Sequence, residues 1–373
     1  MQKNKTILVT GGAGFIGSHV VDLLISSGYR VRVLDNLTPP THAGKRPRFL
    51  NKKAEFIKGD VRKKADWKRG LSGVANVFHL AAHMDQHPDF SRYIRTNIES
   101  AALLFECIAE DNLPITKVIA SSSQAVYGEG KYRCNTHGTI YPLPRSEAAL
   151  LRGEWNVFCP RCGKAMSALP QEEGDQLLPQ STYGISKKAA EELLLHLGQR
   201  HGIPTVSLRY SIPLGPRQSL RHFYSGALRA FTLNALSGEP MKMNEDGLQT
   251  RDFVGVGDAA RAHLIVLEDA RANFQSFNVG SGEATRIMDL AKLVAEEAGV
   301  PFNPSTGGRF RLGDARDSVM SVAKLQALSW KRRQTLREVV REYVAWVREE
   351  GVVVRTLARN YATLKKEGIL KNW

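Results

Sequence analysis

The chain has 373 residues, of which 42% are hydrophobic and 24% are charged, values that are typical of a soluble globular protein and exclude a fibrous or a disordered one. No segment approaches the roughly 20 consecutive apolar residues that span a bilayer, and no apolar leader precedes the first strand candidate, so we expect a cytoplasmic protein. The formal net charge of +15 is compatible with nucleic acid, acidic lipid or phosphorylated small molecules. The basic residues are spread along the chain, however, which indicates a solvated basic surface from which an anionic substrate would benefit.

The first half of the chain alternates short strand candidates with helix candidates. Strands are predicted over residues 7–10, 31–35, 54–58, 77–80, 118–121 and 205–210, and helices over residues 14–27, 67–71, 93–111 and 183–201. Such alternation with short links is typical of right-handed βαβ units. We therefore predict an α/β fold in which residues 1–128 and 181–213 form a doubly wound parallel sheet of the Rossmann type.

Two later regions break this alternation. Residues 129–180 are rich in Gly, Pro, Cys, Arg and Glu and stand between a strand and a helix, which indicates an inserted subdomain. Residues 214–350 mix helix candidates with short strands, which predicts a smaller mixed lobe that binds the substrate. Residues 351–373 form a basic amphipathic tail, and the sequence gives it no readable role.

A glycine-rich loop, Gly11-Gly-Ala-Gly-Phe-Ile-Gly17, joins the first strand to the first helix. In a dinucleotide-binding loop Gly11 would permit the tight turn, Gly14 would let a pyrophosphate approach the backbone, and Gly17 would let the helix pack on the sheet. Asp35 ends the second strand, where a carboxylate accepts hydrogen bonds from the ribose diol and repels a 2′-phosphate. The pattern therefore predicts NAD rather than NADP, with Asp60 and Val61 at the adenine edge; a structural turn with a surface aspartate is the alternative.

A tyrosine and a lysine lie one helical turn apart in Ser181-Thr-Tyr183-Gly-Ile-Ser-Lys187. Residues four apart share one face of a helix, and a neighbouring ammonium lowers the pKa of a phenol because it favours the phenolate. Tyr183 is therefore a candidate general base for an alcohol or sugar hydroxyl beside a hydride acceptor. The chemistry that this predicts is oxidation or reduction at a secondary alcohol carbon.

These motifs, in this order, resemble those of extended short-chain dehydrogenases/reductases, in the nucleotide-sugar epimerase/dehydratase branch. The resemblance covers about residues 5–345 and rests on residues 10–18, 35–36, 79–82, 97, 121–128, 183–187, 209–210, 215–216 and 251–254. Residues 35–42, 218–226, 246–254 and the cysteine-bearing insertion further resemble the dTDP-L-rhamnose 4-epimerase subfamily.

The resemblance implies roles for individual residues. Ser123 would hydrogen-bond the reacting hydroxyl, Tyr183 would be the base, and Lys187 would hold the nicotinamide ribose and lower the pKa of the tyrosine. The cofactor would also contact Phe15, Ile16, Asn36, Leu80, Ala81, Ala82, Asn97 and Pro213. The family's dimer interface implies a homodimer through the helices at residues 93–111 and 183–201, although their apolar faces would equally fit burial within one chain.

The residues after Ser123 separate the reactions of this branch. Relatives that dehydrate or decarboxylate their substrate carry an acidic residue there, whereas this chain has Gln124-Ala125. The resemblance therefore implies a nucleotide-sugar 4-epimerase acting through a 4-keto intermediate. A 4-dehydrogenase or ketoreductase is a second reading, and a non-catalytic scaffold that binds NAD and zinc, or nucleic acid, is a third.

The diphosphate of a nucleotide sugar requires cations, and guanidinium groups suit bidentate phosphate contacts. Family-like positions are held by Arg217, Arg251 and Arg316, with Arg311 as a further candidate. Two segments depart from the family: Ile212 replaces an asparagine that touches the sugar diphosphate, and His83-Met-Asp-Gln-His-Pro88 replaces a small glycine-bearing stretch. Both lie where the sugar should sit, so the sugar and the nucleotide stay open.

Three cysteines and a histidine in the insertion have the spacing of a zinc ribbon. Cys134 and His137 are separated by two residues, and so are Cys159 and Cys162. Three thiolates and one imidazole make a closed tetrahedral site, which predicts structural rather than catalytic zinc. The alternatives are three reduced thiols or a redox switch at Cys159 and Cys162, while Cys107 falls in an apolar helical pattern and is expected to be a buried thiol.

Overall fold

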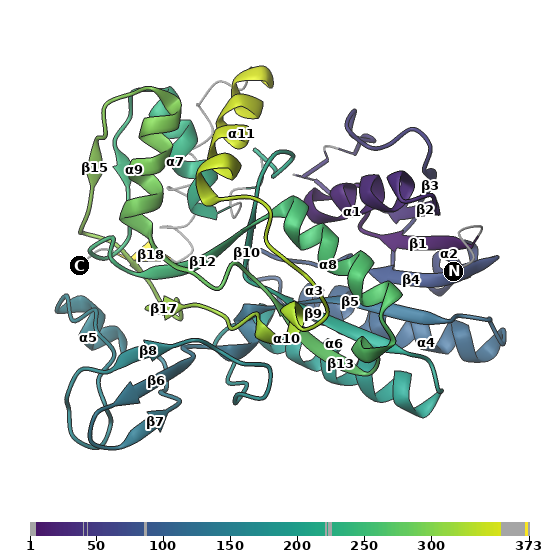
Figure 1. Cartoon of the computed structure of the whole chain (residues 1–373), viewed down its shortest axis with the longest axis horizontal. Helices are drawn as coiled ribbons and strands as arrows, with labels where there is room; N and C mark the ends of the chain where they lie inside the picture. Colours follow the sequence, from purple (N-terminus) through teal and green to yellow (C-terminus); the bar gives the residue numbers. More distant parts are fainter. Residues whose placement is uncertain are drawn as a thin grey trace.

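A seven-stranded parallel sheet forms the centre of the protein in the computed structural model, which describes residues 5–39, 41–42, 44–85, 88–220, 222, 226–351 and 370–371 (Figure 1). The strand order is β13-β9-β5-β4-β1-β2-β3, and every neighbouring pair is parallel. The strands are β1 (Thr6–Thr10), β2 (Arg30–Asp35), β3 (Glu55–Lys58), β4 (Val74–His79), β5 (Lys117–Ser123), β9 (Thr205–Tyr210) and β13 (Gln275–Val279). The predicted parallel sheet is confirmed.

Helices cover both faces of this sheet because its strands carry apolar side chains on both sides. In β1, Ile7 and Val9 belong to one buried cluster, with residues of α1 (Phe15–Ser26) and α8 (Val256–Glu268). The intervening Leu8 belongs to a second cluster, with residues of α2 (Lys64–Leu71), α4 (Ser100–Glu110) and α6 (Thr182–Arg200). Figure 1 shows α1 and α8 above the sheet and α4 and α6 below it.

The strand order fixes where a ligand can bind. From β1 the sheet grows one way through β2 and β3 and the other way through β4, β5 and β9, so the order reverses between β1 and β4. Open parallel sheets bind ligands in the crevice that such a reversal leaves at the carboxyl ends of the strands. The glycine loop follows β1, residues 80–82 follow β4, and Ser123 ends β5, so these segments meet at one edge.

A buried ion pair fixes α6 against the sheet. Arg209 of β9 donates to Glu191 of α6 through Nη2, at 2.6 Å, and through Nε, at 3.0 Å. The second oxygen of Glu191 also accepts a bond from Ser207, at 2.9 Å. Burial opposes ionisation of Glu191, but the hydrogen bonds from Arg209 outweigh it and lower its pKa. The helix that carries Tyr183 is thereby held in one register over β5 and β9.

A smaller lobe contains a mixed sheet of β10 (Ile212–Leu214), β12 (Thr250–Gly255), β14 (Ala284–Arg286) and β17 (Asp317–Ser318). Its own apolar cluster lies between α7 (Gly226–Leu236), α9 (Ile287–Ala298) and α11 (Leu336–Glu349), and α11 begins with a capping box of Thr335 and Glu338. Residues 214–350 also supply β13 to the main sheet and α8 to one of its faces, so the chain returns to the main layer after entering the lobe. The short α10 (Ala323–Gln326) follows β17.

Residues 129–180, called the insertion below, leave the main layer after β5 and return just before α6. They contain β6 (Lys131–Cys134), β7 (Gly138–Ile140) and β8 (Ser167–Leu169), in the antiparallel order β7-β6-β8, and the short helix α5 (Glu147–Leu151) (Figure 1, lower left). The two ends of the insertion touch: a Cβ on Gly128, which has φ +69°, would lie 1.9 Å from the carbonyl oxygen of Leu178. Only glycine is accommodated there.

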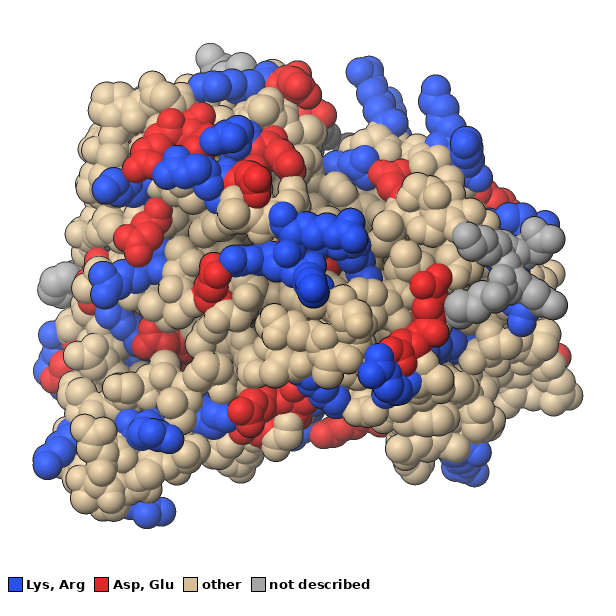
Figure 2. Space-filling model, viewed as in Figure 1, with Lys and Arg blue, Asp and Glu red and all other residues tan. Residues whose placement is uncertain are grey.

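The remaining described strands are short pairs: β11 (Met241–Lys242) with β15 (Pro304–Ser305), and β16 (Phe310–Arg311) with β18 (Leu370–Lys371). Most of the tail predicted over residues 351–373 lies outside the described residues, as do Gln86 and His87 of the unusual segment after β4. None of the helices in the described part of the chain has the length and apolar character required to cross a membrane. Figure 2 shows basic side chains interspersed with acidic ones over the visible face, with one group of basic side chains near its middle.

Candidate active site

The glycine loop packs so closely that its main chain leaves no room for side chains. A Cβ on Gly17 would lie 2.2 Å from the carbonyl oxygen of Gly11, and one on Gly11 would lie 2.8 Å from the Cα of Ala81. Gly14 caps α1 without a side-chain hydrogen bond, and Phe15 and Ile16 form the first turn of that helix. The backbone N–H groups at the start of α1 are therefore available to an anion such as a pyrophosphate.

Asp35 is tied to this loop by its main-chain hydrogen bonds. Its Oδ2 accepts from the N–H of Ala13, at 3.1 Å, and its Oδ1 accepts from the N–H of Leu37, at 2.9 Å. Burial raises the pKa of Asp35, against the hydrogen bond from Leu37. Each carboxylate oxygen keeps a second lone pair, so Asp35 is able to accept the two hydroxyls of a ribose.

Asp60 follows β3 beside Asn36, whose amide approaches its Oδ2 at 3.4 Å. Burial disfavours the charged form of Asp60, but the hydrogen bonds from Arg62 outweigh it and lower its pKa to about 2. The next residue, Val61, is buried, and its carbonyl accepts a bond from the indole of Trp67, at 2.7 Å. The structure thus gathers the predicted adenine-side residues at the ends of β2 and β3.

The ends of β1 and β4 are fastened together by a buried histidine. The Thr10 hydroxyl lies 2.8 Å from Nδ1 of His79 and accepts from the N–H of Ala81, at 3.2 Å. Nε2 of His79 lies 3.0 Å from the Ser100 hydroxyl, and burial lowers the pKa of His79 to about 3, so the ring is neutral. These bonds place the run of Leu80, Ala81 and Ala82 against Gly11.

Asn97 lies in a π-helical turn, Ile94–Glu99, between α3 (Phe90–Tyr93) and α4, where the sequence predicts one uninterrupted helix. Its amide accepts from the N–H of His83, at 2.7 Å, and donates to the carbonyl of His83, at 3.0 Å, and to the Ser186 hydroxyl, at 2.9 Å. Both of its donors are used within the protein. Asn97 therefore links the loop after β4 to α6, and π-helical turns of this kind often mark functional sites.

The three candidate catalytic residues come from β5 and α6. Ser123 ends β5, and its hydroxyl accepts from the N–H of Ala125, at 3.2 Å. A Cβ on Gly184 would lie 2.6 Å from the carbonyl oxygen of Ala125, so the first turn of α6, which carries Tyr183, packs directly on the turn after Ser123.

The Lys187 ammonium is buried next to the end of β5. It donates to the carbonyl of Ser121, at 2.6 Å, and to the Ser121 hydroxyl, at 3.1 Å. Burial lowers its pKa to about 8, against the attraction of Glu191. A lysine held in this way still carries its charge at neutral pH, one helical turn beyond Tyr183, where that charge favours a phenolate.

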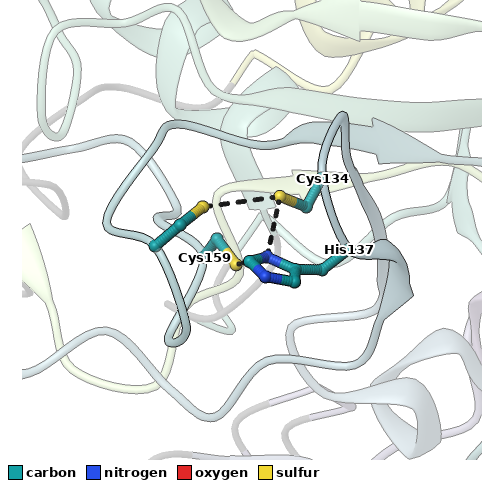
Figure 3. Close-up of side chains that lie close together, drawn as sticks. Cys134, His137 and Cys159 are labelled. Carbon is teal, nitrogen blue, oxygen red and sulfur yellow. Dashed lines mark hydrogen bonds between the residues drawn. The ribbon is translucent and has the colours of Figure 1, made fainter.

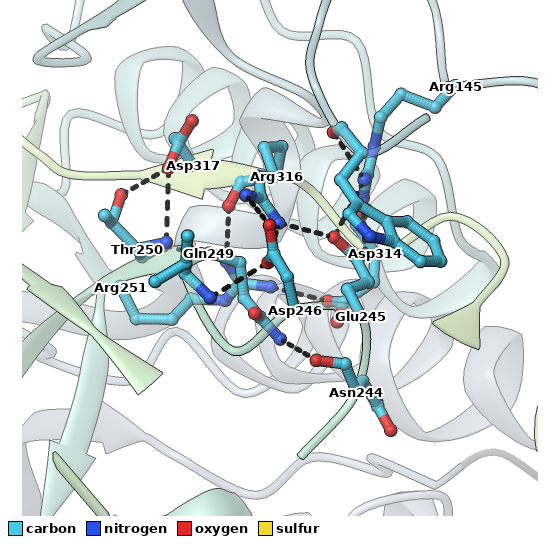
Figure 4. Close-up of polar contacts among 12 residues, drawn as sticks. Arg145, Asn244, Glu245, Asp246, Gln249, Thr250, Arg251, Asp314, Arg316 and Asp317 are labelled. Carbon is cyan, nitrogen blue, oxygen red and sulfur yellow. Dashed lines mark hydrogen bonds and ion pairs between the residues drawn. The ribbon is translucent and has the colours of Figure 1, made fainter. Parts of the chain in front are cut away.

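Of the predicted phosphate-binding arginines, the structure brings two together. Arg251 donates to the carbonyl of Arg316, at 3.2 Å, and pairs with Asp314, at 3.0 Å. Arg316 donates to both oxygens of Asp246, at 2.7 and 2.8 Å (Figure 4). Carboxylates thus hold both guanidinium groups, and these ion pairs could not be predicted from sequence because the partners lie far apart along the chain.

Arg217 lies elsewhere. Its Nη1 donates to Asp22 of α1, at 2.7 Å, and its guanidinium lies over the ring of Phe49, 5.3 Å from the ring centre. Its position after Gly215-Pro216 suggested a phosphate contact, but a motif does not fix the direction of a long side chain, and here an acidic residue on α1 engages it. Pro213 is part of β10, paired with Val254 of β12.

Three side chains near the site have surroundings that the sequence reasoning did not predict. Arg145 of the insertion contacts the Arg316 cluster through Glu245. Gln180 has a buried amide without a hydrogen-bond partner among the described residues. Gln124 accepts a bond from Ser318, at 3.1 Å, so this amide joins the catalytic turn to the smaller lobe. A Gln or Arg in a loop carries no local signal of such a role.

The four predicted metal ligands of the insertion converge (Figure 3). Their ligand atoms all lie within 4.8 Å of one another. The sulfur of Cys134 lies 3.7 Å from that of Cys162 and 3.6 Å from Nδ1 of His137, and the sulfur of Cys159 lies 3.4 Å from the same nitrogen. All of these cysteines, and the buried Cys107, are free thiols rather than disulfides.

Comparison with known proteins agrees with this geometry. Residues 7–147 and 161–280 match the model of the NAD dependent epimerase/dehydratase family. The chain belongs to this family. The unmatched interval between the two segments lies within the insertion, so the epimerase/dehydratase pattern runs through both the sheet and the beginning of the smaller lobe and passes over part of the cysteine-bearing segment.

Individual relatives of this family member are nucleotide-sugar 4-epimerases. The chain is 33% identical over 354 residues to a dTDP-L-rhamnose 4-epimerase from Burkholderia thailandensis, which covers 93% of this chain and 96% of that protein. A UDP-glucose 4-epimerase from Thermotoga maritima, solved with UDP-glucose, has a TM-score of 0.76 and 32% identity over 93% of this chain and 100% of that one. A UDP-glucose 4-epimerase from Thermus thermophilus, in complex with NAD, has a TM-score of 0.73 and 30% identity over 92% and 99%.

Replacing Gly17 with alanine tests the packing of the cofactor loop. The added Cβ would meet the Gly11 carbonyl oxygen at 2.2 Å, and such overpacking costs about 1–3 kcal/mol, so we expect NAD binding to weaken by about fivefold to 150-fold. NAD released from the purified variant, measured by chromatography, gives the occupancy. Gly174→Ala, at a position with nothing within 4 Å of the new Cβ, is the matched control, and equal NAD content in Gly17→Ala and this control would contradict the prediction.

Proposed function

We propose that this protein is an NAD-dependent nucleotide-sugar 4-epimerase that acts on a dTDP- or UDP-linked sugar, of which a 6-deoxyhexose is our first choice. The observation that carries the proposal is the placement of Ser123 and the Tyr183 turn against each other at the carboxyl edge of the sheet, beside the glycine loop. The named relatives, including the 33% identical dTDP-L-rhamnose 4-epimerase, support the same reaction and the first choice of sugar.

The chain's own residues account for the proton transfers of such a reaction. The glycine loop and Asp35 would hold NAD, which supplies a hydride acceptor and donor for the sugar C4. Tyr183 would take the proton of the C4 hydroxyl, aided by the buried charge of Lys187. Ser123 would orient that hydroxyl, and the same two residues would return the proton when the 4-keto sugar is reduced on its other face.

The residue after Ser123 argues against elimination chemistry. Gln124 has no titratable group, and its amide oxygen is engaged by Ser318, at 3.1 Å. A dehydration at C5 and C6 needs a second acid and base. With Ser123, Tyr183 and Lys187 as the candidate groups at this edge, reversible oxidation and reduction at C4 is the reaction that the site supports best.

We infer that the insertion binds one structural zinc ion through Cys134, His137, Cys159 and Cys162. Tetrahedral zinc with Zn–S bonds of about 2.3 Å and Zn–N bonds of about 2.05 Å sets S···S distances of about 3.8 Å and S···N distances of about 3.6 Å. The corresponding distances here, 3.7 Å between two sulfurs and 3.4 and 3.6 Å from sulfur to nitrogen, support this geometry. Four protein ligands leave no open position, so the ion would stabilise the insertion rather than take part in the reaction.

We also propose a homodimer. Large apolar side chains are exposed on the helices that the family uses for its interface: Phe90, Ile94 and Ile185 keep 59%, 46% and 52% of their surface exposed. They belong to α3, the π-helical turn and α6, which pack against one another. Burying such a set against its symmetry mate gives an interface of the isologous kind.

The division of the chain stays a proposal of the same kind. Residues 1–128 and 181–213 would bind NAD, residues 129–180 would bind zinc, and residues 214–350 would bind the nucleotide sugar. The cytoplasmic location stays a prediction from the sequence. The described, unpaired thiols are compatible with it, because reducing compartments keep cysteines available for metals.

The proposed reaction is tested by adding a panel of dTDP-, UDP- and GDP-sugars to the purified protein without added cofactor and following the sugar ring protons by NMR. We expect inversion at C4 without net NADH. Tyr183→Phe should lower the rate about 100- to 10,000-fold because the base is lost, whereas Tyr29→Phe should not. A 4-keto product with accumulating NADH would instead indicate a dehydrogenase, and no turnover of any sugar would contradict the proposal.

The zinc proposal predicts one zinc ion per chain in the purified protein, measured by atomic emission. Cys159→Ser should lose the ion, because three ligands bind structural zinc far more weakly than four. Cys107→Ser, at the buried thiol outside the cluster, should keep it. Protein that is folded and contains no zinc would overturn this assignment.

The dimer proposal predicts that Ile185→Lys dissociates the protein into monomers, because a charge cannot be buried unpaired in an apolar interface. Sedimentation equilibrium gives the mass. Leu143→Lys, at an apolar residue of the insertion that is 80% exposed, serves as the matched control and should stay dimeric. A wild-type protein that is monomeric at micromolar concentration is the opposing result.

A further inference from the structure

Charged side chains gather where the insertion meets the smaller lobe (Figure 4). The cluster contains the two arginines proposed for the diphosphate and the carboxylates that hold them, and its residues come from three separate parts of the chain. They are Glu129 and Arg145 of the insertion, Glu245, Asp246 and Arg251 around β12, and Asp314 and Arg316 before β17. Within this cluster, a chain of hydrogen-bonded ion pairs connects Arg145 of the insertion to the diphosphate arginines.

Arg145 begins this chain of ion pairs. Its guanidinium forms a bidentate ion pair with Glu245, in which Nη1 donates to Oε2 at 3.0 Å and Nη2 donates to Oε1 at 2.9 Å. The same nitrogens donate to the carbonyls of Trp155, at 3.0 Å, and Asp314, at 2.7 Å. Only 5% of the Arg145 side chain is exposed. A planar guanidinium fits this set of four acceptors, and a lysine ammonium does not.

Glu245 links Arg145 to Arg316, because its carboxylate accepts hydrogen bonds from both guanidinium groups. Its Oε2, already bound by Arg145, also accepts from Nη1 of Arg316, at 2.9 Å. Glu245 is buried and has φ 52°, a backbone conformation that is costly for a residue with a side chain. Two arginines therefore hold a buried carboxylate in a strained position, and removal of one leaves that charge undercompensated.

The insertion also contacts the backbone of Arg316 and Asp314, the residue that pairs with Arg251. Oε1 of Glu129 accepts from the backbone N–H of Arg316, at 2.7 Å. The Asp314 whose carbonyl Arg145 binds uses its carboxylate to hold Arg251, at 3.0 Å. Arg145 is thus one residue away from both guanidinium groups that would meet a diphosphate, without being one of them.

We propose that Arg145 is a positioning residue for the nucleotide-sugar site: by holding Glu245 and the Asp314 carbonyl, it fixes Arg316 and Arg251 in the arrangement that binds the diphosphate. The inference rests on the proposed function, since it concerns the substrate of that reaction. It gives the insertion a task in substrate binding, although none of its residues has to touch the sugar. A binding group displaced by about 1 Å loses much of its effect.

Calorimetric titration of the whole protein with UDP and dTDP tests the proposal. We expect Arg145→Met to bind the better of the two nucleotides about tenfold more weakly or worse, with zinc and NAD contents unchanged. Arg152→Met is the matched control, because Arg152 makes the same two-pronged contact with Glu154 at an exposed position of the insertion. Equal binding by Arg145→Met and this control would overturn the proposal.

Two further variants keep the result interpretable. Arg145→Lys retains the positive charge but not the planar guanidinium that makes the bidentate contact, so this variant should fold and still bind the nucleotide more weakly than the wild type. Wild-type affinity in this variant would contradict the proposal even if Arg145→Met did not fold. In the double variant Arg145→Met/Glu245→Gln the loss should be smaller than the sum of the single losses, because no buried charge is left unpaired. With a sugar substrate, the change should appear in KM more than in kcat. A wild type that binds neither nucleotide would overturn the proposed function together with this inference.

Discussion

The close approach of two backbones at the end of the sheet is the constraint on which the site depends. The loop after β1 touches the segment after β4 so tightly that a Cβ on Gly11 would lie 2.8 Å from the Cα of Ala81. Thr10 and the neutral His79 join the two strand ends beneath that contact. Because the strand order reverses at this point, the contact sets the floor of the crevice. The start of α1, Asp35 and the turn after Ser123 all take their positions around it.

Charge is handled differently in the two parts of the protein. In the main layer Glu191 and Arg209 neutralise each other as a buried ion pair, which fixes a helix against the sheet. In the cluster between the insertion and the smaller lobe, carboxylates neutralise the same guanidinium groups that an anionic ligand would need. An incoming diphosphate would therefore replace existing partners rather than meet bare cations, and binding would depend on the difference between two sets of charge-assisted bonds. That arrangement avoids burying uncompensated positive charge when no ligand is present.

Sequence reasoning predicted the elements of the main layer well, because strand alternation and helix periodicity are local signals. The mixture of helices and short strands expected over residues 214–350 is likewise found there. Sequence reasoning did not predict that the chain returns to the main sheet as β13, because joining a distant strand depends on packing rather than on a local pattern. The sequence also predicts regular helix at Asn97, where the structure has a π-helical turn. The reason here is different: a single extra residue in a helical turn leaves the apolar period almost unchanged.

At the candidate site, the sequence motifs predicted which residues take part but not where their long side chains point. Gly17, Asp35 and Lys187 lie where a strand–loop–helix pattern places them, since the backbone fixes their geometry. Arg217 has the right neighbours in sequence, yet its side chain turns to Asp22, because a long side chain follows the nearest opposite charge. Arg145 has no motif at all, and only the folded chain shows which carboxylate it meets.

The narrow stem of the insertion has a consequence for how such chains vary. Because Gly128 and Leu178 are in contact, the insertion leaves the main layer and returns to it at almost the same point, as a closed loop. Loop-closure entropy grows only with the logarithm of loop length, so a long excursion costs the folded body little more than a short turn. A shorter relative could join the two points directly and keep its catalytic helix in place. Such a shortened chain would, however, have to find another cation for Glu245 or replace that glutamate, so the length of this loop and the identity of one residue about a hundred positions away in the sequence are expected to change together.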